Sequence, residues 1–282
     1  MFGLSPIIRR YFLATCLAIS FAASITAQAK PIEVIIYTDN SYPPYSFEED
    51  GKAQGIYADI IRTASMQLDD YKINLKTIPW KRGLLMLEQG KAFALLPPYK
   101  HPSKRPYIFP YSVPILEETV SVYCRDTIAD KKQFNRWPND YYGLVMGRNA
   151  GFMLGGDAYQ KAVEDAEIWE RTAKGNRENV LGLGMGRIDC YINDRISIKY
   201  AYRELKSEGK LKPAHEGIQE TFTISLQNGH IGYTNKDQGE FYFKEDFIEQ
   251  LDKQIIQMKQ DGSIEKIIKR YTEPENDSVI LR

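Results

Sequence analysis

Apolar residues in the first third of the chain follow two different repeats. Short runs of branched and aromatic residues, such as IEVIIYT at 32–38, are typical of buried strands. Other segments carry an apolar residue at every third or fourth position, which predicts helices with one buried face. The two repeats alternate, with strands predicted at 32–38, 71–78 and 92–96 and helices at 56–68 and 80–87.

The same alternation continues to the end of the chain. Gly186 and Gly262 follow two of the later helical segments, where glycine is the usual residue of a helix end. Strands that alternate with helices favour an α/β fold. In this part of the chain strands are predicted at 114–123, 143–146, 166–169, 187–194, 222–226 and 230–233, and helices at 176–185, 247–258 and 263–268.

One arginine is a candidate anchor for a ligand. Arg105 lies in the stretch LLPPYKHPSKRPYIFPYSVPI at 95–115, directly after a predicted strand. A guanidinium can donate two parallel hydrogen bonds to a carboxylate or phosphate, and flanking prolines restrict the backbone that carries it. Ligands of α/β sheets collect beyond the carboxyl ends of strands, so we expect Arg105 to face a cleft. A surface loop with a solvated charge is the alternative.

Two further features stand at predicted strand ends. Asp194 is the last residue of the strand at 187–194. The turn GRNAG at 147–151 follows the strand at 143–146, and its free backbone N–H groups could bind an anion. Polar groups at successive strand ends are the pattern of a small-molecule site.

The N-terminus has the layout of an export signal. Arg9 and Arg10 precede an apolar run at 11–25, and Ala-Gln-Ala at 27–29 fits the cleavage pattern, so we predict a signal peptide at 1–29 and a periplasmic location. The apolar run is short for a membrane span. Cys16 leaves a lipoprotein signal open, and the paired arginines leave a twin-arginine signal open.

Charge and cysteines narrow the functional classes. Without the two signal arginines, 35 basic side chains stand against 37 acidic ones, a net charge of about −2 that gives no attraction to nucleic acid. Cys124 and Cys190 each lie in an apolar, strand-like run, so we expect buried free thiols rather than a disulfide. His101, His215 and His230 are widely scattered, and no metal site or cofactor is predicted.

Several motifs, in the same order along nearly the whole exported chain, resemble those of one family. The chain is similar to periplasmic solute-binding proteins of the polar amino-acid type, which deliver ligands to ABC importers. The resemblance is carried by YPPYSF at 42–47, GIYADIIRTA at 55–64, the spacing from Trp80 through Arg105 to Ser112 and Pro114, GRIDCYIND at 186–194, and MKQDGSIEKIIKRY at 258–271.

The resemblance implies a two-lobed architecture. Each lobe would be a sheet flanked by helices, and two hinge strands would join the lobes. Lobe 1 would comprise residues 30–121 and 222–282, and lobe 2 residues 122–221. The ligand would bind in the cleft, and closure of the lobes would favour the bound state. The resemblance further implies a monomer that passes its ligand to a membrane permease.

The resemblance also assigns roles to four residues whose chemistry is retained. Tyr42 and Trp80 match the aromatic residues that enclose the ligand's side chain. Arg105 matches the anchor of the ligand carboxylate, and Asp194 matches the acid that pairs with its ammonium group. These roles imply an amino acid or a related small carboxylate as ligand.

Other positions depart from the family pattern. Pro97, Pro98 and Lys100 replace small hydroxyl residues before Arg105, and Arg148 and Asn149 replace those after a strand of lobe 2. Prolines keep carbonyl acceptors but cannot donate N–H bonds, so Pro98 could still receive an ammonium. If Lys100 and Arg148 both point into the cleft beside the anchor arginine, the ligand is more acidic than a plain amino acid.

Binding without catalysis is therefore the leading functional prediction. One alternative is a dehydratase-like enzyme on the same scaffold, for which Asp194, Lys100 and Glu117 are the candidate acids or bases. Another is a ligand-sensing partner of a membrane receptor. Neither alternative requires nucleic acid or a cofactor.

Overall fold

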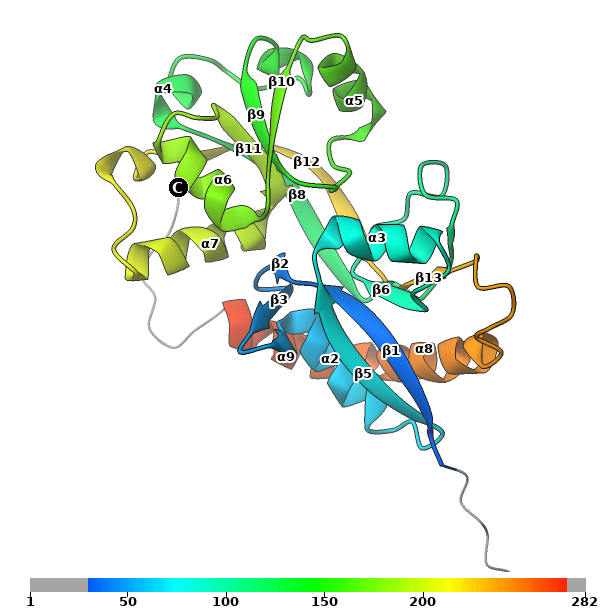
Figure 1. The fold of residues 1–282 in the computed structure, drawn as a ribbon. Helices are drawn as coiled ribbons and strands as arrows, with labels where there is room; N and C mark the ends of the chain where they lie inside the picture. The colour runs from blue at the N-terminus through cyan, green and yellow to red at the C-terminus, as the bar shows by residue number, and fades with distance from the viewer. Residues whose placement is uncertain (1–29, 273–282) are drawn as a thin grey trace, which may run out of the picture.

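The structure is a computed structural model in which residues 30–272 are described. The predicted signal peptide at 1–29 lies outside the described residues. Two five-stranded sheets, each flanked by helices, form two bodies one above the other (Figure 1). This is the two-lobed α/β architecture expected from the sequence, and we call the lower body lobe 1 and the upper body lobe 2.

The sheet of lobe 1 has the order β5-β1-β6-β13-β7. β5, β1 and β6 run parallel, and β13 pairs antiparallel with both β6 and β7. A short sheet of β2, β3 and β4 follows β1. The strands are β1 (Ile32–Asp39), β2 (Ser41–Tyr42), β3 (Ser46–Glu49), β4 (Lys52–Gln54), β5 (Tyr71–Ile78), β6 (Ala94–Leu96), β7 (Ile108–Tyr111) and β13 (Gly232–Thr234).

Helices cover both faces of this sheet because side chains alternate along its strands. In β6, Ala94 and Leu96 pack in one core with α2, α8 and α9, whereas Leu95 packs in another with α3. The carboxyl ends of β1 and β6 are left facing lobe 2. The helices are α2 (Ile56–Ser65), α3 (Trp80–Glu88), α8 (Lys244–Gln260) and α9 (Ser263–Thr272).

The sheet of lobe 2 has the order β10-β9-β11-β8-β12. α5 covers one face and α6 with α7 the other. The strands are β8 (Leu116–Cys124), β9 (Val145–Asn149), β10 (Trp169–Ala173), β11 (Cys190–Asp194) and β12 (Gln219–Gly229). The helices are α4 (Asp126–Ala129), α5 (Gly156–Glu164), α6 (Asn176–Gly184) and α7 (Arg195–Ser207), with short 3-10 turns at Asn139–Tyr141 and Pro213–His215.

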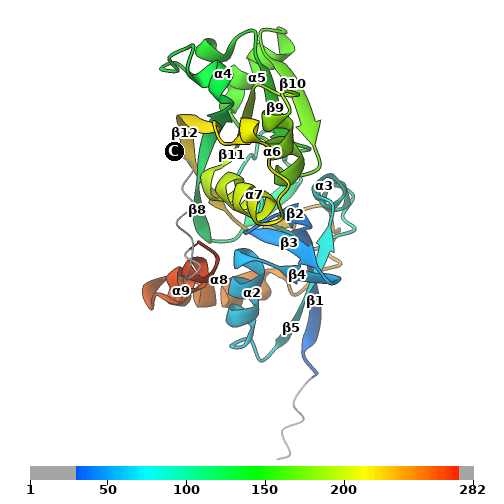
Figure 2. The ribbon, with the colours of Figure 1, turned by 90° about the vertical axis from the view of Figure 1, so that its left-hand side faces the viewer.

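β8 and β12 link the two lobes. They pair antiparallel from Leu116↔Gly229 to Cys124↔Gln219, with irregular register in β12 between Glu220 and Ser225. β8 runs from lobe 1 into the sheet of lobe 2, and β12 returns from that sheet to lobe 1 (Figures 1 and 2). The lobe boundaries expected from the sequence, at 121/122 and 221/222, fall inside these two strands.

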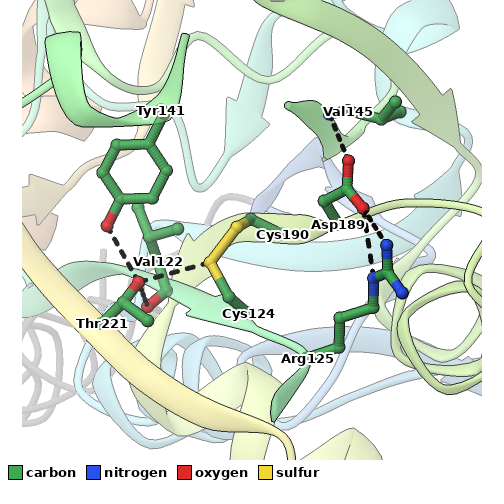
Figure 3. The surroundings of a disulfide bond; sticks show 8 residues. All are labelled: Val122, Cys124, Arg125, Tyr141, Val145, Asp189, Cys190 and Thr221. Carbon is green, nitrogen blue, oxygen red and sulfur yellow. Dashed lines mark hydrogen bonds and ion pairs between the residues drawn. A yellow bond between two sulfur atoms is a disulfide. The ribbon is translucent and has the colours of Figure 1, made fainter. Parts of the chain in front are cut away.

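The cysteine prediction was wrong, because Cys124 and Cys190 form a disulfide (Figure 3). The residues face each other directly in the antiparallel pair of β8 and β11, with Cα atoms 4.0 Å apart. The sequence shows two apolar strands but not their register, which decides whether the sulfur atoms meet. Thr221 of β12 covers the bond, with its hydroxyl 3.4 Å from the sulfur of Cys124.

Candidate ligand-binding site

A small cavity lies between the lobes, where the carboxyl ends of β1, β6 and β9 meet. Its volume is about 30 Å³, room for about two water molecules. Lobe 1 supplies most of the lining and the segment after β9 supplies the rest. The lining residues are Asp39, Tyr42, Trp80, Pro97, Tyr99, His101, Arg105, Phe152, Met153 and Leu154.

Arg105 is the only basic residue other than histidine in this lining. Its side chain is buried, with 6% of the residue exposed, and burial lowers its pKa. Nη2 donates a hydrogen bond to the carbonyl oxygen of Gly151, 2.8 Å away. Among residues 30–272 no acid forms an ion pair with it, and an arginine remains charged in proteins. A buried cation without a counter-charge is costly, so this group favours an anionic ligand.

Aromatic side chains form the walls beside Arg105. Tyr42 and Trp80, predicted to enclose the ligand, are both buried and both line the cavity. The guanidinium carbon of Arg105 lies 5.8 Å from the centre of the Trp80 ring. The buried indole Nε1 of Trp80 has no hydrogen-bond partner among residues 30–272 and can donate to a ligand.

Asp194 is buried but does not line the cavity. One carboxylate oxygen accepts from the backbone N–H of Ser197 at 2.8 Å and thereby caps α7. The other accepts from the N–H of Thr119 at 3.0 Å. Burial, reinforced by the nearby Glu118 carboxylate, raises the pKa of Asp194 to about 8. Its oxygens are thus engaged within the protein and do not face the cavity.

Glu118 is a buried acid that the sequence reasoning missed. Its carboxylate accepts hydrogen bonds from the hydroxyls of Tyr42 at 2.5 Å, Tyr99 at 2.6 Å and Tyr57. Burial raises its pKa. The signal lay in β8, where every second residue from Leu116 faces inward, so Glu118 shares the buried face whereas Glu117, the candidate chosen from the sequence, is exposed.

Asp39 is the second acid that was missed, and it does line the cavity. It ends β1, and Oδ1 accepts from the backbone N–H of Ser41 at 3.0 Å. Burial raises its pKa to about 7. His101 also lines the cavity, and its pKa is lowered by burial and by the guanidinium of Arg105. At neutral pH the charge of the cavity therefore depends on Arg105 and on the protonation of Asp39.

The structure does not bring the two other predicted basic residues to the cavity. Arg148 forms a bidentate ion pair with Glu170 of β10, at 2.7 and 2.5 Å. Lys100 is exposed, with its ammonium 5.8 Å from the centre of the Tyr111 ring. Lys100 and Arg148 therefore do not join Arg105 in lining the cavity, so the condition for a more acidic ligand is not met.

Pro98 and Asn149 have structural partners instead of facing the cavity. The carbonyl of Pro98 accepts from the backbone N–H of His230 at 3.1 Å. The Asn149 side chain is buried and binds Asn176 at 2.8 Å and Tyr191 at 2.8 Å. Asn176 also donates across the cleft to the carbonyl of Pro43 at 3.2 Å. The contact of Asn176 with Pro43 joins the two lobes, whereas the contacts of Pro98 and of Asn149 each lie within one lobe and occupy these groups.

Residues 34–274 match the family model described as bacterial extracellular solute-binding proteins, family 3. The chain belongs to this family. Solute-binding proteins of this kind act outside the cytoplasm and are generally not enzymes. The resemblance to polar amino-acid binding proteins is thereby confirmed. A search of curated protein sequences finds no match to this chain.

Solved structures share the fold of this solute-binding protein at low sequence identity. A histidine kinase sensor domain similar to periplasmic binding proteins has 12% identity and a TM-score of 0.69, covering 86% of this chain and 97% of its own. An ancestral amino acid-binding protein, a precursor of cyclohexadienyl dehydratase, has 17% identity and a TM-score of 0.63, covering 86% and 95%. A histidine-bound ABC transporter binding protein from Streptococcus pneumoniae has 16% identity and a TM-score of 0.62, covering 88% and 95%.

Within residues 30–272, none of the helices combines the length and hydrophobicity needed to cross a membrane. In the same residues, no three histidine, cysteine, aspartate or glutamate side chains are grouped in a way that could hold a metal ion.

Proposed function

We propose that this protein captures a small carboxylate in the cleft between its lobes and delivers it to the membrane permease of an ABC importer. The family supports solute binding for uptake. The ligand carboxylate binds Arg105, and its apolar part lies against Tyr42 and Trp80. Because Asp194 is not among the residues that line the cavity, its predicted pairing with an ammonium group is not part of this proposal.

The observation that carries the proposal is the buried, unpaired charge of Arg105. Among residues 30–272, its guanidinium donates one hydrogen bond, to the neutral backbone carbonyl of Gly151 in the other lobe, at 2.8 Å. A carboxylate bound at the same place would accept two hydrogen bonds and neutralise the charge. Binding there would replace the hydrogen bond that now joins Arg105 of lobe 1 to Gly151 of lobe 2.

Isothermal titration of the exported protein with a panel of amino acids and small carboxylic acids tests the proposal. Arg105→Ala should weaken binding by about 2–5 kcal/mol, roughly 30-fold or more, because the pair is buried and charge-assisted. Arg171→Ala is the matched control, since Arg171 is exposed in β10. Absence of binding by any carboxylate, or equal binding by the Arg105 variant, would rule the proposal out.

A dehydratase-like enzyme is the second candidate, favoured by one observation. Asp39 lines the cavity and burial raises its pKa to about 7, the range in which a carboxyl group can give and take a proton. The ancestral neighbour named as a precursor of cyclohexadienyl dehydratase makes cyclic carboxylates the substrates to try. Turnover of prephenate or arogenate that disappears in Asp39→Asn would establish this activity, and no turnover would exclude it for those substrates.

A sensing role is the third candidate, consistent with the sensor-domain neighbour. Uptake and sensing use the same bound state and differ in the membrane partner. Uptake would be supported if membrane vesicles that contain the permease take up the ligand only when this protein is present.

A further inference from the structure

The turn after β9 fills the place where a ligand is expected. The Phe152 ring lies next to Tyr42, with ring centres 5.2 Å apart and planes at 86°, and next to Trp80, at 6.0 Å and 71°. Phe152 packs against the hydrophobic cores of both lobes. One residue earlier, the carbonyl of Gly151 accepts the hydrogen bond from Arg105. The Gly151 carbonyl oxygen thus occupies the place of a ligand carboxylate at Arg105, and the Phe152 ring occupies the place of a ligand side chain beside Tyr42 and Trp80.

This arrangement depends on a close approach of the turn to lobe 1. Gly151 has φ +85°, a conformation that side chains other than glycine rarely adopt. A Cβ atom there would lie 2.8 Å from Cγ of Lys81 and 3.2 Å from Cδ1 of Trp80. The turn is closed by a hydrogen bond from the N–H of Phe152 to the carbonyl of Asn149, at 3.1 Å. The backbone is therefore shaped to seat these two residues against α3.

Glu118, Asp194 and the Pro98 carbonyl, which could recognise an ammonium, already accept hydrogen bonds from the protein. Glu118 accepts three tyrosine hydroxyls, and the oxygens of Asp194 accept two backbone N–H groups. The Pro98 carbonyl accepts from His230. The cavity is lined by the guanidinium of Arg105, by the indole N–H of Trp80, which has no partner among residues 30–272, by aromatic surfaces and by Asp39, whose carboxylate accepts from the N–H of Ser41. This chemistry suits a carboxylate attached to an apolar ring and does not require an amino group.

We propose that Gly151 and Phe152 act as an internal stand-in for the ligand, and that the ligand is an arylalkanoate. Three atoms, the nitrogen, Cα and Cβ of Phe152, separate the Gly151 carbonyl carbon from the ring. An acid with a comparable spacer places its carboxylate at Arg105 and its ring between Tyr42 and Trp80 once Phe152 withdraws. The proposal rests on carboxylate binding at Arg105, as set out above, and adds the ligand class.

Titration calorimetry with 4-phenylbutanoate, 3-phenylpropanoate, butanoate and a set of polar amino acids tests the ligand class. The wild-type protein should bind the two aryl acids at least tenfold more tightly than butanoate, because only the aryl acids carry a ring that fits between Tyr42 and Trp80. Tighter binding of a polar amino acid would overturn the arylalkanoate proposal while leaving carboxylate capture intact. Absence of binding by every carboxylate would instead overturn the proposed function.

Phe152→Ala tests the stand-in directly. This substitution removes the ring that competes with the ligand for the space between Tyr42 and Trp80. The affinity for 4-phenylbutanoate should therefore rise at least tenfold. Phe152→Leu keeps an apolar contact with both lobes and should give a smaller rise in affinity. This variant provides the test if the alanine variant does not fold. Phe109→Ala is the control, since Phe109 is 66% exposed. Unchanged or weaker binding in the Phe152 variants would show that the ring is a fixed wall and would overturn the proposal.

Discussion

Replacing Glu118 by alanine would leave the hydroxyls of Tyr42, Tyr57 and Tyr99 without the acceptor that all three share. A buried donor left without a partner costs about 1–3 kcal/mol, so three could cost roughly 3–9 kcal/mol. The cost of burying the carboxylate, which appears as its raised pKa, offsets part of this loss. We therefore expect the lower end, a decrease of about 3 kcal/mol in the free energy of unfolding.

Urea denaturation at neutral pH measures this decrease, and the neighbouring residue provides the control. Glu117 precedes Glu118 in β8 but is exposed, so Glu117→Ala should change stability by less than about 0.5 kcal/mol. Glu118→Gln keeps one acceptor oxygen and should lose an intermediate amount. If Glu118→Ala were within about 1 kcal/mol of Glu117→Ala, the tyrosine hydroxyls would not depend on the carboxylate, and the reasoning would fail.

Two further predictions concern protonation and the disulfide. The pKa of Asp39 is raised to about 7, so its side chain is neutral below that pH and adds a negative charge to the cavity above it. The affinity for a carboxylate should therefore be full below about pH 7 and fall by about 1 kcal/mol, roughly fivefold, as the pH rises through 7. Calorimetry should find no such fall in Asp39→Asn. Removing the bond between Cys124 and Cys190, which are 66 positions apart, by a double alanine substitution should cost up to about 4 kcal/mol and lower the melting temperature. Equal pH profiles in the first case, or equal melting temperatures in the second, would refute these expectations.

The fold and one anchor of the site were accessible from the sequence because they depend on local patterns. A strand such as β1 is predicted from a continuous apolar run, whose residues are neighbours in the chain. The position of Arg105 after a strand is likewise predicted from neighbouring residues. α7 was missed, although Ile198, Ala201, Tyr202 and Leu205 recur at helical spacing, because many charged residues lie between them.

The remaining features depend on distances between segments that no local pattern contains. The Glu118 cluster joins residues 19 to 76 positions apart. The disulfide needs the register of β8 against β11, and the position of Phe152 needs the arrangement of the two lobes. The directions of the Arg148 and Lys100 side chains also could not be predicted from the sequence, because Arg148 pairs with Glu170 of another strand and Lys100 is exposed near Tyr111.

The first linking strand is fixed at its two ends to different bodies. Near its start, Glu118 of β8 binds Tyr57 in α2 of lobe 1, and at its end Cys124 is bonded to Cys190 in lobe 2. Because Val120–Cys124 also pair with β11 in the sheet of lobe 2, a rotation of one lobe against the other must be absorbed in β8 between Glu118 and Val120. In mechanical terms, the protein is two stiff bodies connected by a few bendable peptide units.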